Sequence, residues 1–206
     1  MAHYTKKLLP FLLLTLIFFS CIECQSQVGG PCEGCEAIHE YGNKILTPID
    51  TLPHFESNEP KLKITGTVLT KDGKPARNVI IYIYHTNRKG VYETKGDESG
   101  WAKRHGFIRG WVKTGGDGKY TFYTFRPASY PVRSEPEHIH ITVKEPDKNE
   151  YYVDNILFDD DRLLTQDKRT ELKDRGGSGI VNPRQSNGIY SVERDIFLGK
   201  NIPDYP

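Results

Sequence analysis

Two closely spaced histidines are the sharpest chemical feature of the sequence, and the local pattern places them on a β-strand. His138 and His140 are separated by one residue in the run Glu-Pro-Glu-His-Ile-His-Ile. Alternate side chains of a strand share a face, so both imidazoles point one way while Ile139 and Ile141 point toward a core. Residues two apart on a strand lie about 7 Å apart, which lets both rings bind one metal ion.

The histidine pair alone leaves alternatives open. Two exposed strand histidines without any ligand give the same pattern. A cupin metal site also begins with His-x-His followed by a glutamate, and Glu145 has that spacing. A cupin needs a further histidine, however, and none follows His140. The glycines that frame the cupin motif are absent too, so the sequence disfavours this alternative.

Short strands separated by turns are expected from residue 61 onward. Alternating aliphatic, aromatic and polar residues, bounded by Gly, Pro and Asp turns, mark six strands: residues 62–70, 79–85, 119–125, 138–143, 151–158 and 189–198. One helix is expected within 161–173, where leucines recur. The pattern predicts an all-β fold, namely a β-sandwich of antiparallel or mixed strands with long loops and one short helix.

Four motifs, the last of which contains the two histidines, follow one another along the chain. They are Gly-Trp-Val-Lys-Thr at 110–114, Asp-Gly-Lys-Tyr-Thr-Phe at 117–122, Arg-Pro-Ala-Ser-Tyr-Pro at 126–131 and Pro-Glu-His-Ile-His at 136–140. Together they resemble the intradiol ring-cleavage dioxygenases, the family of catechol, protocatechuate and hydroxyquinol dioxygenases. The resemblance runs from about residue 64 to residue 158.

The resemblance implies an Fe(III) cofactor held by two tyrosinates and two histidines. His138 and His140 match the histidines, and Tyr130 matches the tyrosine of the Tyr-Pro motif. Tyr92 ends an Asn-Arg-Lys-Gly-Val-Tyr stretch and is the expected fourth metal ligand. Phenolates are hard anionic donors, which favours Fe(III) over Fe(II).

The implied reaction is cleavage of a catechol-type ring by dioxygen between its two hydroxylated carbons, giving a muconate-type diacid. In the family mechanism the substrate chelates the iron and displaces Tyr130, which then accepts a proton. Tyr82 and Tyr84 compete with Tyr92 for the fourth position, although both lie inside a predicted strand, where sheet packing explains them equally well.

Two positions depart from the family pattern. Glu135 stands where the family usually has an arginine credited with stabilising negative charge on the substrate. Arg133 is the candidate catalytic replacement, with an exposed strand-end arginine as the equal alternative. Asn155 matches a glutamine near the metal, and it keeps the amide with a shorter reach. These positions bear on rate and substrate choice rather than on the metal site.

The N-terminal residues predict export. Two lysines precede an apolar run at 8–19, which is too short to span a bilayer. Ser20-Cys21 follows as in a bacterial lipobox. We expect residues 1–20 to be a lipoprotein signal peptide and Cys21 to be lipidated, anchoring an exported protein at a bacterial membrane on its periplasmic or cell-surface side. A plain secreted protein cut a few residues later is the alternative.

Residues 21–60 are expected to form a tether and a segment that leads into the domain at 61–206. Cys32 and Cys35 form a Cys-x-x-Cys motif in this segment. A zinc site would need two more ligands, and a thioredoxin-like motif would need a βαβ context. Outside the cytoplasm a local disulfide is the favoured interpretation.

Charge and composition limit the partners. The 28 basic and 27 acidic residues give a net charge of +1, which offers no reason to expect nucleic acid. The expected partners are an aromatic diol and dioxygen, with a membrane contact through the lipid anchor only; the oligomeric state is left open. A carboxylated diol would need a nearby cation, and the loop candidates are Arg88, Lys89, Lys103, Arg104 and Arg109.

Two other functions fit parts of the sequence. Residues 66–79 also resemble small β-sandwich domains appended to surface proteins, which bind partners without a metal. A ferric site that binds catechols without turning them over is the second alternative, because Glu135 replaces the usual arginine.

Overall fold

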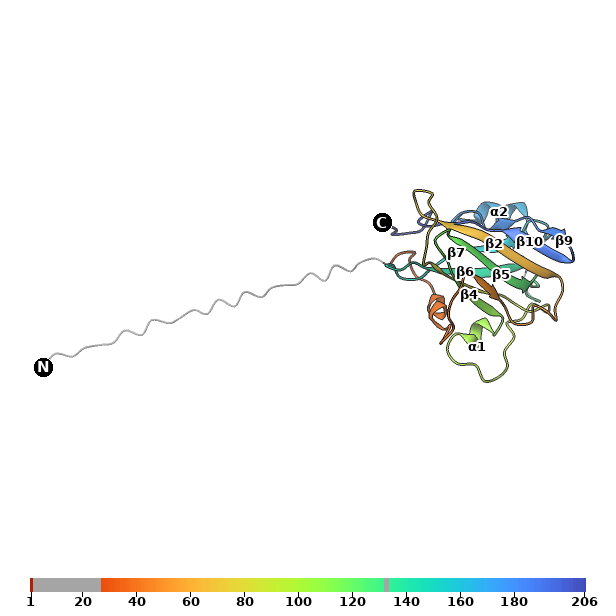
Figure 1. Ribbon diagram of the computed structural model, residues 1–206, viewed down its shortest axis with the longest axis horizontal. Coiled ribbons are helices and arrows are strands. Elements are labelled where there is room, and N and C mark those ends of the chain that lie inside the picture. Colours follow the sequence, from red (N-terminus) through yellow and green to blue (C-terminus); the bar gives the residue numbers. More distant parts are fainter. Residues whose placement is uncertain (2–26, 132–133) are drawn as a thin grey trace.

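Two mixed β-sheets pack face to face in the computed structural model, which describes Met1, residues 27–131 and residues 134–206 (Figure 1). The first sheet has the order β1 (Ile49–Thr51), β5 (Lys119–Phe125), β2 (Lys61–Leu69), β10 (Ile189–Glu193) and β9 (Arg184–Ser186), and β11 (Ile196–Phe197) also pairs with β2. The second has the order β4 (Arg109–Lys113), β3 (Ile80–Tyr84), β6 (His138–Lys144), β7 (Tyr151–Phe158) and β8 (Ile180–Val181). The predicted all-β sandwich is confirmed.

Aliphatic and aromatic side chains from both sheets fill the space between them. Ile64 and Phe122 of the first sheet are fully buried, as are Ile81 and Ile139 of the second. Burial along β2 alternates strictly with every second residue, because successive side chains of a strand point to opposite faces. The β-branched and aromatic residues of these segments suit such a half-buried pleated surface.

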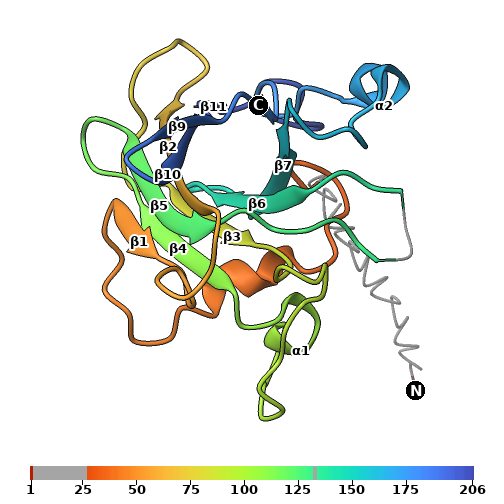
Figure 2. The ribbon, with the colours of Figure 1, turned by 90° about the vertical axis from the view of Figure 1, so that its right-hand side faces the viewer.

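The outer face of the second sheet carries aromatic side chains instead of aliphatic ones. Tyr82 packs there with Trp111, Ala37 and Ile38 in a second buried cluster. The 3-10 helix η1 (Cys35–His39) and the helix α1 (Ala102–His105) flank this face. In Figure 2, α1 lies at the bottom of the molecule, whereas α2 (Gln166–Glu171) lies at the top right.

The packed domain begins earlier than residue 61, which corrects the expected boundary. Strand β1 pairs in parallel with β5, and Leu52 and Ile38 are buried in the two clusters. Residues 27–60 therefore contribute a strand and a helical turn rather than a tether. These elements are three and five residues long, too short to show a periodic pattern in the sequence.

Other elements differ from the prediction in detail. The expected strand 189–198 is two strands, β10 and β11. Arg194 lies between them in the sequence, and its buried guanidinium donates hydrogen bonds to the carbonyl oxygens of Gly176 and Gly177. Strand β4 and helix α1 were not anticipated. Helix α2 lies within the expected range but is shorter, and it begins after Thr165, whose side chain accepts a hydrogen bond from the Lys168 backbone N–H.

Some expectations concern residues that the structure does not describe. The signal peptide, Cys21 and Arg133 all lie outside the described residues. Within the described part of the chain, no helix is both long and apolar enough to cross a membrane.

Candidate metal centre and substrate cavity

Four side chains singled out from the sequence converge on the outer face of the second sheet. His138 and His140 come from β6, Tyr92 from the loop after β3, and Tyr130 from the loop after β5. Tyr92 Oη lies 2.7 Å from His140 Nε2, and Tyr130 Oη lies 3.2 Å from His138 Nε2. The two tyrosine hydroxyls also contact each other. We call these four residues the donor quartet.

The loops that carry the two tyrosines are packed directly against each other. Asn87 Oδ1 accepts hydrogen bonds from the backbone N–H groups of Lys89 and Val91, which closes the turn before Tyr92. Gly90 in that turn has a φ of 74°, and a Cβ there would lie 2.1 Å from the Ser129 carbonyl oxygen. Only glycine permits this approach, and the approach sets the two tyrosines side by side.

Neighbouring groups orient both imidazoles toward the tyrosines. His138 Nδ1 lies 2.8 Å from the Pro136 carbonyl oxygen. Because a carbonyl only accepts, Nδ1 carries the proton and Nε2 presents its lone pair toward Tyr130. His140 is hydrogen-bonded by the Asn155 side chain. It also lies at an irregularity in the pairing of β6 with β7, a feature that re-aims side chains near active sites.

Burial shifts the pKa values of two members of the quartet, Tyr92 and His140. It raises the pKa of Tyr92 far above its ordinary value, and the hydrogen bond with Tyr130 raises it further. It also lowers the pKa of His140 well below the ordinary imidazole value. Without a cation, both side chains are therefore neutral. A bound metal ion would reverse this preference for Tyr92, since ligands bind metals in their deprotonated form.

The strand tyrosines that competed with Tyr92 act as packing rings. Tyr84 stacks between two imidazoles, with its ring centroid 4.4 Å from that of His140 and 3.8 Å from that of His105. The Tyr82 hydroxyl lies 2.9 Å from His105 Nδ1. The Tyr82 hydroxyl is thus engaged with His105 rather than with the quartet, and the Tyr84 ring packs on the face of His140.

The quartet fits a ferric ion in spacing and in donor type. Metal bonds to nitrogen and oxygen are about 2.0–2.2 Å long, so neighbouring donors of one ion lie roughly 3 Å apart, close to the separations across the quartet. Two phenol oxygens and two imidazole nitrogens form a hard, partly anionic set suited to Fe(III). Among the described residues, no group of three or more His, Cys, Asp and Glu side chains offers another metal site.

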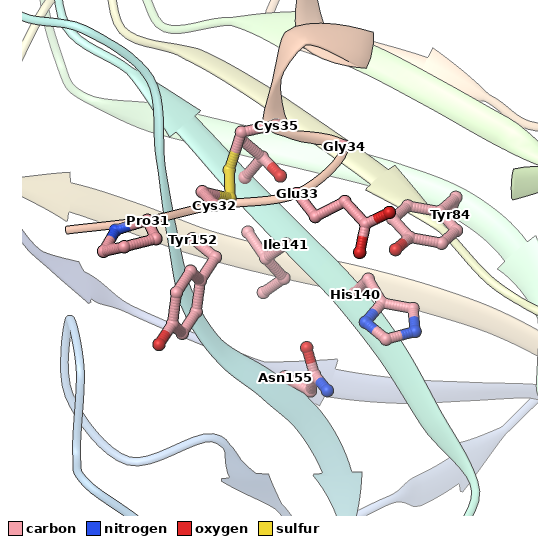
Figure 3. A pocket seen from close by; sticks show the side chains of 11 residues that line it. Pro31, Cys32, Glu33, Gly34, Cys35, Tyr84, His140, Ile141, Tyr152 and Asn155 are labelled. Atoms are coloured by element: carbon pink, nitrogen blue, oxygen red, sulfur yellow. A yellow bond between two sulfur atoms is a disulfide. The ribbon is translucent and has the colours of Figure 1, made fainter. Parts of the chain in front are cut away.

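A cavity of about 250 Å³ opens onto the quartet. Three members of the quartet line this cavity together with five neighbouring side chains. The lining residues are Glu33, Tyr84, Tyr92, Trp101, Arg104, His105, Tyr130 and His140. A second cavity of about 320 Å³ lies on the other side of Glu33 and reaches His140 and Asn155. Figure 3 shows Glu33 extending from its loop toward Tyr84, with His140 and Asn155 below it.

The loop that carries Glu33 is closed by a disulfide. Cys32 and Cys35 are bonded to each other, as the sequence predicted. Both cysteines line the larger cavity, so the Cys-x-x-Cys motif forms part of a cavity wall beside the quartet.

Several lining residues were missed from the sequence. Trp101 and His105 lie at a four-residue helix without a periodic pattern, and their aromatic character in a polar loop was the only signal. Arg104 was one of five loop cations considered, and it alone of the five lines this cavity. Glu135 is exposed, and its negative charge contributes to raising the pKa of Tyr92.

Comparison with known proteins agrees with this geometry. A family model described as "Dioxygenase" matches residues 47–175, more than half of the chain. The protein belongs to the intradiol ring-cleavage dioxygenase family.

Two curated relatives illustrate the range of similarity. The protocatechuate 3,4-dioxygenase beta chain of Burkholderia cepacia is 30% identical over 139 residues, which cover 62% of this chain and 59% of the relative. Catechol 1,2-dioxygenase 1 of Acinetobacter lwoffii is 45% identical over 85 residues, which cover 41% of this chain and 26% of the relative. This chain thus spans 59% or less of the length of these two relatives.

Solved structures share the fold at lower identity. The dioxygenase domain of a dioxygenase–carbohydrate-binding protein fusion from Streptomyces sp. SirexAA-E has a TM-score of 0.58 and 21% identity, covering 82% of this chain and 95% of that chain. Wild-type catechol 1,2-dioxygenase of Acinetobacter radioresistens has a TM-score of 0.59 and 17% identity, covering 88% and 64%. These likenesses establish the architecture.

Proposed function

We propose that the donor quartet holds Fe(III) and that the protein cleaves a catechol-type ring between its two hydroxylated carbons, using dioxygen and giving a muconate-type diacid. The observation that carries the proposal is the convergence of two tyrosine hydroxyls and two imidazole nitrogens beside a cavity. Membership of the intradiol family supports it.

Bound Fe(III) would supply a Lewis acid that binds the diol as its dianion and makes the ring reactive toward dioxygen. Tyr130 is placed to manage a proton, because its hydroxyl belongs to the quartet and its side chain lines the cavity. In our proposal Tyr130, as a phenolate when iron is bound, would accept at Oη one of the two protons that the diol loses on binding, and the other would pass to solvent. Tyr92 is held by both Tyr130 and His140, which suits a ligand that stays in place.

The surrounding side chains position the quartet and limit the substrate. Asn155 holds the His140 ring through a hydrogen bond, and such partners of metal-binding histidines fix the ring orientation. Tyr84 covers the face of the same ring. The cavity of about 250 Å³ is smaller than the pockets of about 300–1,000 Å³ that hold drug-sized ligands. It therefore suits a substrate with one aromatic ring.

Oxygen consumption tests the proposal. The iron-loaded protein is given catechol, protocatechuate and hydroxyquinol in turn, and each product is identified by mass spectrometry. We expect uptake with at least one diol and a diacid product that contains both atoms of dioxygen. Uptake should disappear in the His140→Ala protein. An iron-loaded protein with no uptake on any diol contradicts ring cleavage.

A second candidate is an iron-containing protein that binds catechols without turnover. The observation that favours it is the carboxylate of Glu135, which lies close enough to influence Tyr92 and cannot stabilise negative charge on a substrate. A change in the visible spectrum on adding catechol, without oxygen uptake, would identify this function. A colourless protein without iron after purification from iron-replete cells would instead support a metal-free binding module.

We also propose that the protein is exported and anchored by a lipid on Cys21 at a bacterial membrane. Ser20-Cys21 after an apolar run supports this proposal, and the Cys32–Cys35 disulfide suits an oxidising compartment. Metabolic labelling with a fatty acid should mark the wild-type chain and the Cys24→Ser chain but not the Cys21→Ser chain. A mature N-terminus beyond Cys21 without lipid would contradict the anchor.

A further inference from the structure

An ion pair borders the cavity beside the donor quartet. Arg104 Nη1 of α1 contacts Glu33 Oε1 of the disulfide loop, 71 residues away in sequence. Both residues line the cavity with Tyr92, Tyr130 and His140. Their side chains are 62% and 71% exposed, so the pair stands where the cavity meets solvent.

The backbones on both sides of this ion pair are anchored. The Cys32–Cys35 disulfide brackets Glu33. Gly34 is packed so closely on α1 that a Cβ there would lie 2.8 Å from His105 Nε2. The opposite side is fixed by the Trp101 backbone N–H, which donates to a Glu40 carboxylate oxygen at 2.8 Å. The backbones are therefore held in place, while the charged ends of Glu33 and Arg104 reach the solvent-exposed edge of the cavity, where the Arg104 guanidinium also lies 5.5 Å from the centroid of the Trp101 ring.

Arg104 is the one cation among the described residues that line this cavity. Arg88 donates to the carbonyl oxygens of Arg126 and Pro127, at 2.8 Å each. Arg109 pairs with Glu40 at 2.6 Å and lines a different cavity. A negative group entering beside the quartet would thus meet Arg104 and no other described cation of the cavity lining.

We propose that Arg104 binds an acidic substituent on the ring of the diol, and that Glu33 gives way to it. The inference rests on the proposed diol site and names two residues that set its substrate preference. Ion pairs this exposed contribute little to stability, so the Glu33 carboxylate is easily displaced. A guanidinium pairs with a carboxylate through two parallel hydrogen bonds, which an arriving substrate carboxylate can take over.

Glu33 then acts as a built-in competitor. While it is paired with Arg104, it neutralises the cation and repels an arriving anion. Removing its charge should strengthen binding of an acidic diol, whereas removing the charge of Arg104 should weaken it. A merely structural ion pair predicts that both substitutions change the protein in the same direction.

The test compares dissociation constants for two ligands under anaerobic conditions, so that binding is measured without turnover. The probes are 3,4-dihydroxybenzoate and unsubstituted catechol, added to the iron-loaded protein and followed by calorimetry. We expect Arg104→Gln to raise the ratio of the benzoate constant to the catechol constant about tenfold, since one charge-assisted contact is lost. Glu33→Gln should lower the same ratio by a few fold.

Matched control variants distinguish the effect of losing a charge at the cavity from the effect of losing a charge elsewhere on the protein. Lys103 precedes Arg104 in α1, and Glu36 lies in η1; both are exposed and neither lines the cavity. Lys103→Gln and Glu36→Gln should leave the ratio unchanged. Thermal melting confirms that all four variants are folded.

Two results would overturn the inference: equal changes for both ligands, or a ratio that falls in Arg104→Gln. The outcome is separate from that of ring cleavage. A ratio that depends on Arg104 without any oxygen uptake supports the inference and contradicts turnover. If oxygen is consumed but the ratio of dissociation constants does not change in Arg104→Gln, only the inference is contradicted.

Discussion

The donor quartet and the cavity wall beside it are built in different ways. The histidines of the quartet come from one strand, and its tyrosines come from two loops that pack on each other beside that strand. The wall that holds Glu33 and Arg104 joins a disulfide loop to a four-residue helix. The quartet has a sheet beneath it, whereas the wall is held by one disulfide, one close glycine contact, one ion pair and the hydrogen bond from Trp101 to Glu40.

The difference separates metal binding from substrate choice. Changes in the quartet should remove iron and activity together. Changes in the wall should alter which diol binds while the iron stays.

Replacing His140 with alanine should reduce iron retention by at least about a hundredfold, because the imidazole and its contact to Tyr92 are both lost. Iron per protein after dialysis against a chelator is the measurement. His39→Ala is the matched control, since His39 is exposed and pairs with Glu150. An equal iron content in His140→Ala and the wild type would show that His140 is not a metal ligand.

Iron(III) bound by tyrosinate should give a visible absorption band from charge transfer between the phenolate and the iron. Replacing Tyr92 with phenylalanine should shift or bleach this band and lower the iron content. The reason is the loss of one phenolate donor, while ring packing is kept. Tyr84→Phe should preserve the band, because Tyr84 contributes stacking to His140. The opposite pattern would make Tyr84 the ligand.

Replacing Asn155 with leucine should lower iron affinity about 10- to 100-fold, the usual effect of losing the partner that orients a metal-binding histidine. The hydrogen bond to His140 is removed while the side chain keeps a similar size. A competition titration with a chelator gives the affinity. Unchanged affinity would show that the strand alone orients His140.

Removing the disulfide with Cys32→Ser and Cys35→Ser should leave the iron content unchanged and lower the ratio of the 3,4-dihydroxybenzoate dissociation constant to the catechol constant by a few fold, because Glu33 would compete less for Arg104. The loop that positions Glu33 would lose its covalent closure. Loss of iron in this double variant would show that the wall and the quartet are one unit after all.

The sequence could predict the sheet-borne part of this site because a strand has a period of two residues. That period put His138 and His140 on one face and Ile139 and Ile141 on the other, and the structure buries both isoleucines in the core. Family motifs then pointed to Tyr92 and Tyr130, which the structure brings to the same place.

The cavity wall could not be predicted for physical reasons. The contact of Glu33 with Arg104 joins residues 71 positions apart, and no local pattern encodes such a pairing. Glu33 lies in the turn before the five-residue η1, and Arg104 lies in a four-residue helix; neither element is long enough to repeat an amphipathic pattern. The sequence predicted a tether and an entry segment at 21–60 for the same reason, whereas β1 within this segment forms an edge of the first sheet.

Anomalous diffraction at the iron absorption edge, from crystals of the iron-loaded protein, would locate the metal ion. We expect one strong peak about 2 Å from Tyr92 Oη, Tyr130 Oη, His138 Nε2 and His140 Nε2, the usual length of metal–ligand bonds. A peak elsewhere in the protein, or none between these four atoms, would contradict the assignment of the donor quartet as the iron site.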